Sequence, residues 1–488
     1  MRIFERLHHQ LNWSKGRYVA VLLSVLFVGY VASAIYHTFK PLPQGLDYTG
    51  KLRHSDVKFI SDQTYLDVHG KQQQDHKIFD QVLSLIQQAK NTIVIDMFLF
   101  NGEVGASKQT QRALTQQLTQ ALIKKKLEHP NISIQFITDP INSVYGGTSP
   151  THYRQLRQVG IDVVETDLTP LRASNPLWSG FWYICCQGLK NNPAGGWLPN
   201  PFGQDKITLR SYLSLLNFKA NHRKTIVVDT DEGWKGLVTS ANPHDGSSRH
   251  DNVALLLNGS MAVDVLNSEL PVAQISHSEE AMSVIIGAEK VDPQWPQAQV
   301  LTERAIQRAA LNLIDTAKAS DHLDLAMFYL SERQIIQALK AAQQRGVQVR
   351  VLLDPNKDAF GRQKNGIPNR QVAWELHKAG INVRWCDTHG EQCHSKMLLK
   401  QGQKQSELLL GSANFTARNL KNYNLETDIR VIGSRQQAVF NDAANYFNVA
   451  WSNLNGRQMS VDYTQYADES WLKYGVYRFM EWSGLSTF

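Results

Sequence analysis

Two short motifs contain the residue types that chemistry at a phosphate needs. His222 and Lys224 are separated by one residue in the first motif. His394 and Lys396 have the same spacing in the second. In both copies an asparagine, Asn242 or Asn414, follows the lysine by 18 residues. Because side chains alternate along a strand, a His and a Lys two residues apart point to the same face. Each motif therefore predicts an imidazole beside an ammonium group, which suits proton transfer or nucleophilic attack near an anion.

The elements that position these motifs occur twice along the chain. Apolar runs at 225–228 and 397–399 predict a buried strand directly after each motif. Further landmarks recur in the same order: 93–98 with 323–328, 132–140 with 347–355, and 156–161 with 376–381. Segments 79–89 and 305–317 carry apolar residues at helical spacing. Alternating strands and helices predict a duplicated α/β unit, each copy with a mostly parallel sheet flanked by helices.

The two halves differ in the length of the segment before the motif. Asp167 precedes His222 by 55 residues, whereas Asp387 precedes His394 by seven, so the first half carries about 48 extra residues. This insert, at about 168–215, is rich in Trp, Tyr and Phe. It is either a loop with its own small core or a rim of the active cleft that touches lipid or shapes an acyl-chain pocket.

The repeat predicts the organisation of the chain. We expect an N-terminal anchor and linker at 1–45, a first unit at 46–280, a second unit at 281–456 and a tail at 457–488. The tail contains several large aromatic residues that either pack on the body or lie on a membrane. We expect them to pack.

The N-terminal segment predicts a membrane anchor. Residues 18–36 contain no charge and would span about 28 Å as a helix, which is enough for a bilayer core. The basic residues that precede it are Arg2, Arg6, Lys15 and Arg17. They favour a single-pass helix with a cytoplasmic N-terminus and a periplasmic body at a bacterial inner membrane. The alternative is a signal peptide cleaved near 32–34, where the sequence reads Ala-Ser-Ala.

Charge and cysteine content narrow the classes of partner. The net charge of +7 favours an anionic partner, either a membrane surface or nucleic acid. Four cysteines are too few for a disulfide scaffold. Cys185 and Cys186 are adjacent and hard to bridge to each other. Cys386 and Cys393 could form a bridge in an oxidising compartment, while metal binding together with nearby histidines fits no common zinc spacing. No metal or other cofactor is predicted.

The motifs resemble those of the phospholipase D superfamily. The first reads H-x-K-x4-D, ending at Asp229, and the second half adds G-S-x-N at 411–414; segment 221–229 is similar to the first motif of bacterial cardiolipin synthases. The second copy departs from the pattern, with Gln401 in place of the Asp, and the first has Thr239 where Gly is usual. The resemblance covers roughly residues 75–455. It implies one body in which two motifs meet across a pseudo-two-fold cleft and one histidine forms a phosphohistidine.

Displacement at a phosphodiester without metal needs a nucleophile, an acid and cations around the phosphoryl oxygens. Following the family's order, we assign His222 as nucleophile and His394 as general acid and then base. Asp229 completes the catalytic set of the first motif. The groups expected to hold the phosphate or to stabilise its loops are Lys224, Lys396, Asn242, Asn414, Ser240 and Ser412.

Each catalytic histidine also needs an acceptor at its second nitrogen. The sequence N-L-E at 424–426 resembles the family's N-x-E, which implies that Glu426 orients His222 from across the cleft. Alignment of the strands that follow places Asn252 opposite Glu426, so His394 would rely on Asn252 or Asp251. An amide partner leaves an imidazole less basic, which suits an acid better than a nucleophile.

These features predict a membrane-anchored phospholipase D-like enzyme that hydrolyses glycerophospholipids or transfers their phosphatidyl group to an alcohol. The predicted partner is a phospholipid membrane, with no obligate protein partner. A nuclease of the same superfamily is the alternative, because a basic body also suits DNA or RNA. A third possibility is a membrane-tethered binding protein with a degenerate site.

Overall fold

The motif strands are buried on both faces, and this burial determines how the molecule is layered. In β7 (Lys224–Thr230), Ile226 and Val228 belong to a core beneath helices, whereas Val227 belongs to a different core. β16 (Lys396–Gln401) divides its side chains in the same way. Each sheet is therefore covered by helices on one side and by the other sheet on the other side.

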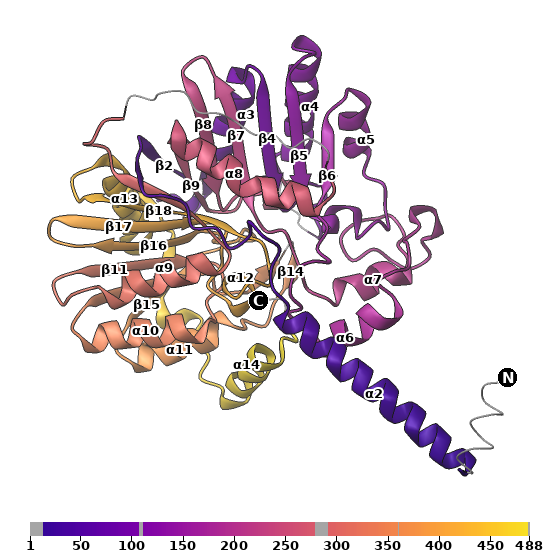
Figure 1. Ribbon diagram of the computed structural model, residues 1–488. Coiled ribbons are helices and arrows are strands. Elements are labelled where there is room, and N and C mark those ends of the chain that lie inside the picture. Colours follow the sequence, from indigo (N-terminus) through magenta and orange to yellow (C-terminus); the bar gives the residue numbers. More distant parts are fainter. Residues whose placement is uncertain (1–12, 107–110, 279–290, 360, 487–488) are drawn as a thin grey trace.

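The computed structural model describes residues 13–106, 111–278, 291–359 and 361–486, and Figure 1 shows its two sheets with their helices. The first sheet has the order β3-β2-β9-β8-β7-β4-β5-β6. Its remaining strands are β3 (Gln72–Asp75), β2 (Val57–Leu66), β9 (Asn252–Asn258), β8 (Gly233–Thr239), β4 (Thr92–Met97), β5 (Ser133–Thr138) and β6 (Asp162–Glu165). Helices α3 (Ile78–Gln88), α4 (Leu114–Glu128) and α5 (Thr151–Gln158) pack against its outer face.

The second sheet repeats this order. It runs β1-β10-β18-β17-β16-β11-β12-β15-β19, so that β18-β17-β16-β11-β12-β15 corresponds to β9-β8-β7-β4-β5-β6. Its remaining strands are β1 (Arg53–His54), β10 (Gln297–Thr302), β18 (Thr427–Ser434), β17 (Gln405–Gly411), β11 (His322–Met327), β12 (Gln348–Leu353), β15 (Asn382–Cys386) and β19 (Ser460–Asp462). Helices α9 (Arg304–Asp315), α10 (Arg333–Gln344) and α11 (Asn369–Lys378) cover its outer face.

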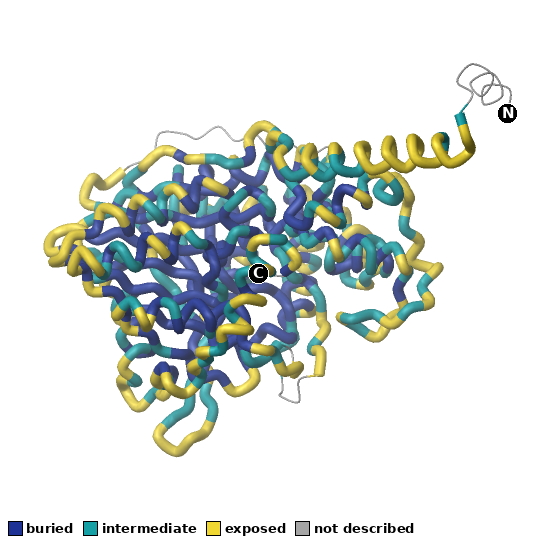
Figure 2. Tube along the Cα trace, turned by 90° about the horizontal axis from the view of Figure 1, so that it is seen from below, coloured by how far each residue is buried: buried dark blue, intermediate teal, exposed yellow. Residues whose placement is uncertain are grey.

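The inner faces of the two sheets share one hydrophobic core. Val227, Val238 and Leu255 of the first sheet lie in it with Leu399 and Leu408 of the second. Helices α8 (Ser260–Ile275) and α13 (Ala438–Ser452) complete this core, and Figure 2 shows the buried interior continuing through the body. The two sheets therefore have no independent interiors, and the packing between them sets the position of anything built at their junction.

The prediction of mostly parallel sheets is wrong. Only the pairs β4–β5, β5–β6, β11–β12 and β12–β15 are parallel among the named strand pairs of the described residues, and the others are antiparallel. Two residues join β7 to β8, and such a short connection permits only an antiparallel hairpin. The apolar runs indicate burial on both faces, which is typical of parallel sheets but arises here from stacking two sheets.

Element boundaries agree closely with the sequence pattern. The helix predicted at 79–89 is α3, and the one predicted at 305–317 is α9. One segment crosses between the halves: β1, which the predicted first unit includes, pairs with β10 of the second sheet. In the tail, β19 adds a strand beside β15, and α14 (Trp471–Ser483) packs through the buried Tyr477 while exposing Trp471, Leu472 and Trp482.

The apolar N-terminal helix projects from the body (Figure 1). Helix α2 (Lys15–Phe39) has a mean hydropathy of 2.2 over its most apolar window and buries no residue. Its last turns lie against α6 (Pro176–Cys185) of the insert, where Ser33 Oγ donates to Gly180 O at 3.0 Å. Tyr30 Oη likewise donates to Leu177 O at 2.9 Å. Leu177, Phe181 and Ile184 of α6 are exposed beside it.

A buried arginine, the middle residue of the first motif, forms ion pairs that connect the two halves. Arg223 has no exposed surface, and its Nη2 lies 2.7 Å from Glu303 Oε1 at the start of α9, in the second half. Its Nη1 lies 3.2 Å from Glu269 Oε2 in α8. Burial alone would lower the pKa of Arg223, but Glu303 and Glu269 raise it above its ordinary value. The guanidinium therefore stays charged.

Arg223→Met should lower the free energy of unfolding by about 3–5 kcal/mol, because it leaves two buried carboxylates without a counter-charge. The matched control is Arg308→Met, which removes an exposed pair with Asp47 and should cost about 0–1 kcal/mol. Denaturant titration of the full chain in detergent, followed by tryptophan fluorescence, measures both. Equal, small losses would show that the buried network does not hold the halves together.

Candidate active site

Each motif is held in place by backbone hydrogen bonds to the other half of the chain. His222 N donates to Leu425 O at 2.9 Å, and Leu425 N donates to Ala220 O at 3.0 Å. In the same way His394 N donates to Asp251 O at 2.9 Å. Leu425 and Asp251 directly precede Glu426 and Asn252. The backbone thus delivers to each histidine the residue that orients it.

Both imidazoles have an orienting partner at Nδ1 and a phenylalanine ring packed against them. His222 Nδ1 lies 2.9 Å from Glu426 Oε2, and His394 Nδ1 lies 3.1 Å from Asn252 Oδ1. Phe98 packs on His222 with ring centroids 4.7 Å apart, and its counterpart Phe328 lies 5.0 Å from His394. A partner at Nδ1 leaves Nε2 as the reactive nitrogen of each ring. The expected pairing of Glu426 with His222 and of Asn252 with His394 agrees with this geometry.

The serines of the two asparagine loops hold the orienting residues. Ser412 Oγ donates to Glu426 Oε2 at 2.5 Å, and Asn419 Nδ2 donates to the other carboxylate oxygen. Ser240 Oγ donates to Asn252 Oδ1 at 3.0 Å. The two serines therefore act through Glu426 and Asn252, in keeping with the loop-stabilising part of the expected role.

The lysines are buried beside the histidines. Lys224 Nζ donates to His222 O at 2.6 Å and lies 5.0 Å from the Phe98 ring centroid. Lys396 Nζ donates to His394 O at 2.8 Å in an equivalent position over Phe328. Each ammonium keeps two further N–H donors for a ligand.

The loop asparagines are also buried, and they differ in their hydrogen bonds. Asn242 Oδ1 accepts from Leu99 N at 3.3 Å, whereas Asn414 Oδ1 is buried without a hydrogen-bond partner among the described residues. A buried acceptor without a partner is costly, so the Asn414 oxygen is available to a hydrogen-bond donor.

The four basic groups act on one another across the two halves. Burial, together with Lys224 and Lys396, lowers the pKa of His222 to about 4 against the opposing effect of Glu426. Burial and Lys396, and also Lys224 and His222, hold the pKa of His394 well below its usual range. Burial lowers the pKa of Lys224 to about 7. A phosphodiester anion at this site would relieve the repulsion, because it favours the protonated form of all four groups.

Two aspartates that the sequence reading did not assign to the site support the motif backbones. Asp139 Oδ2 accepts from Asn221 N at 2.6 Å, and Asp354 Oδ2 accepts from Cys393 N at 2.9 Å, each one residue before a motif histidine. Burial raises the pKa of Asp139 to about 7 and that of Asp354 to about 6. The sequence does contain a signal for them, because each is followed by proline at the end of one of the recurring segments 132–140 and 347–355.

Two predicted acids lie away from the imidazoles. Asp229 is at the opposite end of β7 from Lys224, where it accepts from Asn91 N at 2.9 Å and Thr92 N at 2.6 Å. The catalytic assignment of Asp229 is therefore corrected: its carboxylate holds the start of β4. Asp251 Oδ1 accepts from Thr64 N at 2.5 Å, which leaves Asn252 as the side-chain partner of His394.

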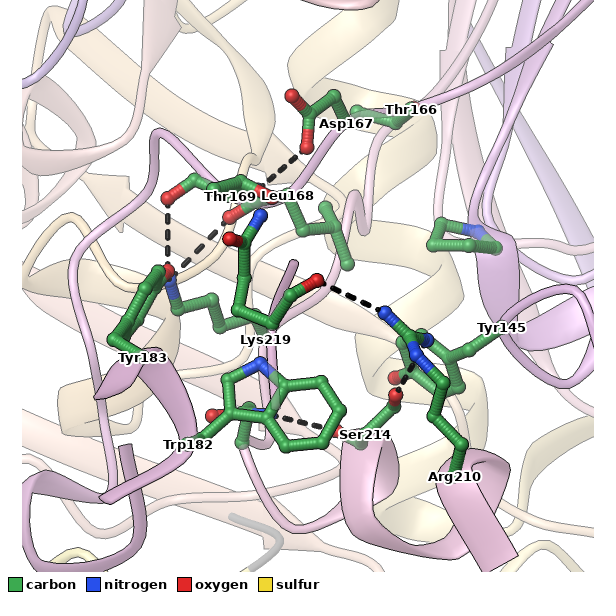
Figure 3. A pocket seen from close by; sticks show the side chains of 13 residues that line it. Tyr145, Thr166, Asp167, Leu168, Thr169, Trp182, Tyr183, Arg210, Ser214 and Lys219 are labelled. Atoms are coloured by element: carbon green, nitrogen blue, oxygen red, sulfur yellow. Dashed lines mark hydrogen bonds between the residues drawn. The ribbon is translucent and has the colours of Figure 1, made fainter. Parts of the chain in front are cut away.

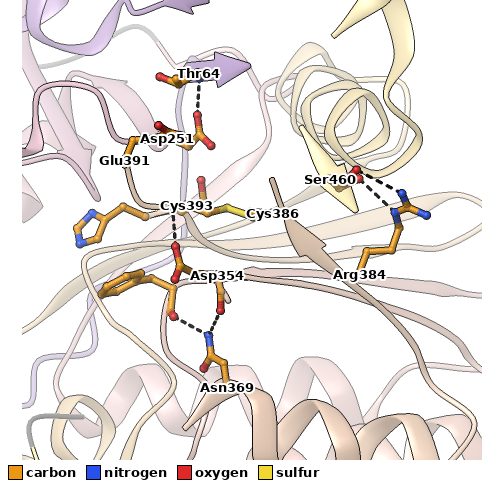
Figure 4. The surroundings of a disulfide bond; sticks show 12 residues. Thr64, Asp251, Asp354, Asn369, Arg384, Cys386, Glu391, Cys393 and Ser460 are labelled. Carbon is orange, nitrogen blue, oxygen red and sulfur yellow. Dashed lines mark hydrogen bonds between the residues drawn. A yellow bond between two sulfur atoms is a disulfide. The ribbon is translucent and has the colours of Figure 1, made fainter. Parts of the chain in front are cut away.

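Both cysteine pairs are disulfide-bonded. Cys386 and Cys393 are joined, so a bridge closes the loop immediately before His394 (Figure 4). Cys185 and Cys186 are joined as well, contrary to the expectation that adjacent cysteines would not pair. The four sulfurs are thus engaged in disulfides and are not metal ligands.

The second half of the chain matches a known family. Residues 311–451, which include His394, Asn414 and Glu426, match the family model described as "Cardiolipin synthase, PLD-like domain". The chain carries a phospholipase D-like domain. The cardiolipin synthase of Listeria monocytogenes serotype 4a is 24% identical over 247 residues, covering 46% of this chain and 47% of that protein. The chain thus spans about half the length of these curated relatives, and over that part it is similar to cardiolipin synthases.

Two further comparisons bear on the fold. A polyphosphate kinase of Exiguobacterium sibiricum is 34% identical over 130 residues, which are 25% of this chain and 16% of that protein. The crystal structure of a phosphatidylserine synthase from Haemophilus influenzae superposes with a TM-score of 0.54 at 11% identity. The superposition covers 90% of this phospholipase D-like chain and 95% of the synthase. It shows a shared mixed α/β fold.

Glu426→Gln should reduce kcat/KM by about 10²–10⁴-fold, because it removes the charge that orients and stabilises His222. We expect His222 to attack as the neutral imidazole, so activity should rise with pH through its pKa of about 4, compared with the ordinary 6.5. Glu426 raises that pKa, so the acid limb should move to lower pH in the variant.

The matched control is Glu407→Gln, a buried carboxylate paired with Lys400 and Arg430 away from the site. It should keep the wild-type rate and pH profile. An acid limb that stays in place in Glu426→Gln would mean that Glu426 does not act on the titrating group.

Proposed function

We propose that this protein is a membrane-anchored phospholipase D-like enzyme that cleaves or exchanges the phosphodiester of glycerophospholipids through a phosphohistidine. The observation that carries the proposal is the pair of buried imidazoles, each oriented at Nδ1 by a residue from the other half of the chain. Two buried ammonium groups accompany them. These groups supply a nucleophile, an acid and cations for the phosphoryl oxygens.

The first step displaces the leaving alcohol. His222 Nε2 attacks phosphorus, the P–O bond to the leaving group breaks, and protonated His394 gives its Nε2 proton to the departing oxygen. Lys224 and Lys396 hold the non-bridging oxygens together with the amides of Asn242 and Asn414. Binding of the phosphodiester raises the pKa of His394 and so favours the protonated form that this step needs.

The second step reverses these roles. Neutral His394 takes a proton from water or an acceptor alcohol, whose oxygen attacks phosphorus while the P–Nε2 bond to His222 breaks. The acceptor therefore decides between hydrolysis and phosphatidyl transfer. The relatives named as cardiolipin synthases favour transfer for this chain.

The difference between Glu426 and Asn252 supports the assignment of roles. An imidazole that bonds to phosphorus at Nε2 becomes cationic, and a carboxylate at Nδ1 stabilises that cation. His222 has such a carboxylate at 2.9 Å. His394 has an amide oxygen, which fixes the ring without adding charge, and so leaves it a better proton donor.

Three features support a lipid substrate at a membrane; the basic residues before α2 are the argument for placing the body in the periplasm at a bacterial inner membrane. Helix α2 is about 37 Å long, which is enough to span a bilayer. The exposed apolar side chains of α6 lie beside its last turns, and α14 exposes a further aromatic face. A cavity of about 620 Å³ next to Phe98 is lined in part by Val144 and by Phe202 of the insert, which suits an apolar part of the substrate.

We further infer that the two sheets arose by duplication, with units near 46–280 and 281–456 related by a pseudo-two-fold axis through the site. The matching strand orders and the paired contacts of Phe98 and Phe328 support this. In this arrangement a single chain supplies both halves of the catalytic centre.

Purified full-length protein should release phosphatidic acid from anionic liposomes, or form a transfer product when glycerol or phosphatidylglycerol is added. His222→Ala and His394→Ala should each abolish this activity. With lipid labelled at phosphorus, His394→Ala should retain an acid-labile label on the protein and His222→Ala should not. Cleavage of an oligonucleotide with inert liposomes would instead identify a nuclease.

Asn252→Asp tests the assignment of roles, because it gives His394 the kind of partner that His222 has. A carboxylate raises the pKa of His394, so the alkaline limb of kcat/KM should move to higher pH. The matched control Asn258→Asp lies at the far end of β9 and should leave the profile unchanged. If His394 were the nucleophile, Asn252→Asp would move the acid limb instead.

A further inference from the structure

A second, cationic cavity lies between the insert and the segment that leads to His222. Its volume is about 220 Å³, and its walls come from α6, α7 (Leu209–Leu215) and residues 166–169 and 217–219. Figure 3 shows Arg210, Trp182, Tyr183 and Lys219 around it. The catalytic histidines do not line this cavity.

Arg210 borders the cavity without an acidic partner. Its Nη1 is 3.4 Å from Ser214 Oγ and its Nη2 is 3.2 Å from Gln187 O, both long contacts. The guanidinium carbon lies 5.2 Å from the ring centroid of Trp182. Nε is buried without a hydrogen-bond partner among the described residues. No ion pair in the described part of the chain includes Arg210, so its charge is free to meet an anion.

The rest of the lining contains one lysine and one carboxylate. Lys219 Nζ is buried and donates to Leu171 O and to Tyr183 Oη, each at 2.6 Å. Burial and the neighbouring Lys40 lower the pKa of Lys219 well below its ordinary value, and Asp167 opposes them. Asp167 is the one carboxylate in the described lining. An anion would therefore enter a pocket that holds the Arg210 guanidinium, one buried lysine and one acid.

The cavity lies where the apolar helix α2 ends. His37, in the last turn of α2, stacks on Tyr183 with ring centroids 3.5 Å apart. Lys40, the residue after the helix, donates to Thr169 O at 2.7 Å and lies 5.2 Å from the Tyr183 ring. In a chain whose α2 spans a bilayer, residues 37–40 are at the depth of lipid headgroups. The pocket then opens at the level of lipid phosphates.

The same wall connects to the catalytic centre. Thr166, which lines the cavity, accepts at Oγ1 from Asn221 Nδ2 at 2.9 Å, and Asn221 directly precedes His222. Lys219 lies three residues before His222 on the same segment. A headgroup held here lies next to the segment that carries His222, in a cavity separate from the one that would take the reacting phosphate.

We propose that this cavity binds the phosphate of an anionic phospholipid at Arg210 and so holds the second lipid substrate, the acceptor, beside the phosphohistidine site. The proposal rests on the proposed function and adds to it the place where the acceptor binds. The guanidinium makes charge-assisted hydrogen bonds to the phosphate through its Nη groups, and the Trp182 ring lies against it.

Calorimetric titration tests the proposed phosphate site. The full-length protein in detergent is titrated with glycerol phosphate and, separately, with short-chain phosphatidylglycerol below its micelle concentration. Wild type should show two phosphate sites, because the catalytic centre also takes an anion. In Arg210→Gln the affinity of one of the two sites should fall about 10- to 100-fold. The KM for phosphatidylglycerol as acceptor should rise by a similar factor. Lys206→Gln, an exposed lysine of the same insert, removes the same charge and should retain both sites.

Arg210→Lys keeps the positive charge and should bind the phosphate with intermediate affinity. Such partial binding would show that the loss in Arg210→Gln is not caused by misfolding. Retention of both sites in Arg210→Gln would overturn the proposal. Binding of glycerol phosphate without phosphatidylglycerol would overturn the assignment to lipid. If the wild-type protein turns over no phospholipid but Arg210→Gln still loses one anion site, the proposed function is wrong and the anion site stands.

Discussion

The backbone hydrogen bonds exchanged between the halves at the two motifs are the constraint on which the site depends. The residue before Glu426 pairs with the segment carrying His222, and the residue before Asn252 pairs with the segment carrying His394. Neither imidazole is oriented by its own half. The shared core between the sheets is what brings these segments into register, so packing far from the chemistry controls its geometry.

Local patterns predicted the elements well and their directions poorly. Spacing located the strands after both motifs and the helices α3 and α9 within a residue or two, because periodicity is a local property. Strand direction depends on connection length and on what covers each face. The two-residue turn after Thr230 indicated a hairpin, but the apolar run was read as a parallel strand. A run of apolar residues reports burial and carries no information on direction.

The site shows the same division between local and long-range information. The His–Lys pairs, the loop serines and Glu426 were found from spacing and resemblance. Asp229 was misplaced because five residues of strand carry it to the opposite end of β7. The partners of Arg223, Glu269 and Glu303, lie in remote helices, and nothing in the motif itself indicates that its middle residue points inward to them.

The contact between α2 and α6 has a kinetic consequence for an anchored enzyme. An anchor joined by a flexible linker lets a catalytic body tumble, whereas Ser33 and Tyr30 bond directly to the insert that precedes His222. In the membrane-anchored enzyme that we propose, we expect the cleft to keep one inclination to the bilayer and the substrate to arrive by lateral diffusion within a leaflet. Turnover in such a system follows the mole fraction of lipid in the surface, and diluting the substrate with inert lipid slows it even when the bulk concentration is constant.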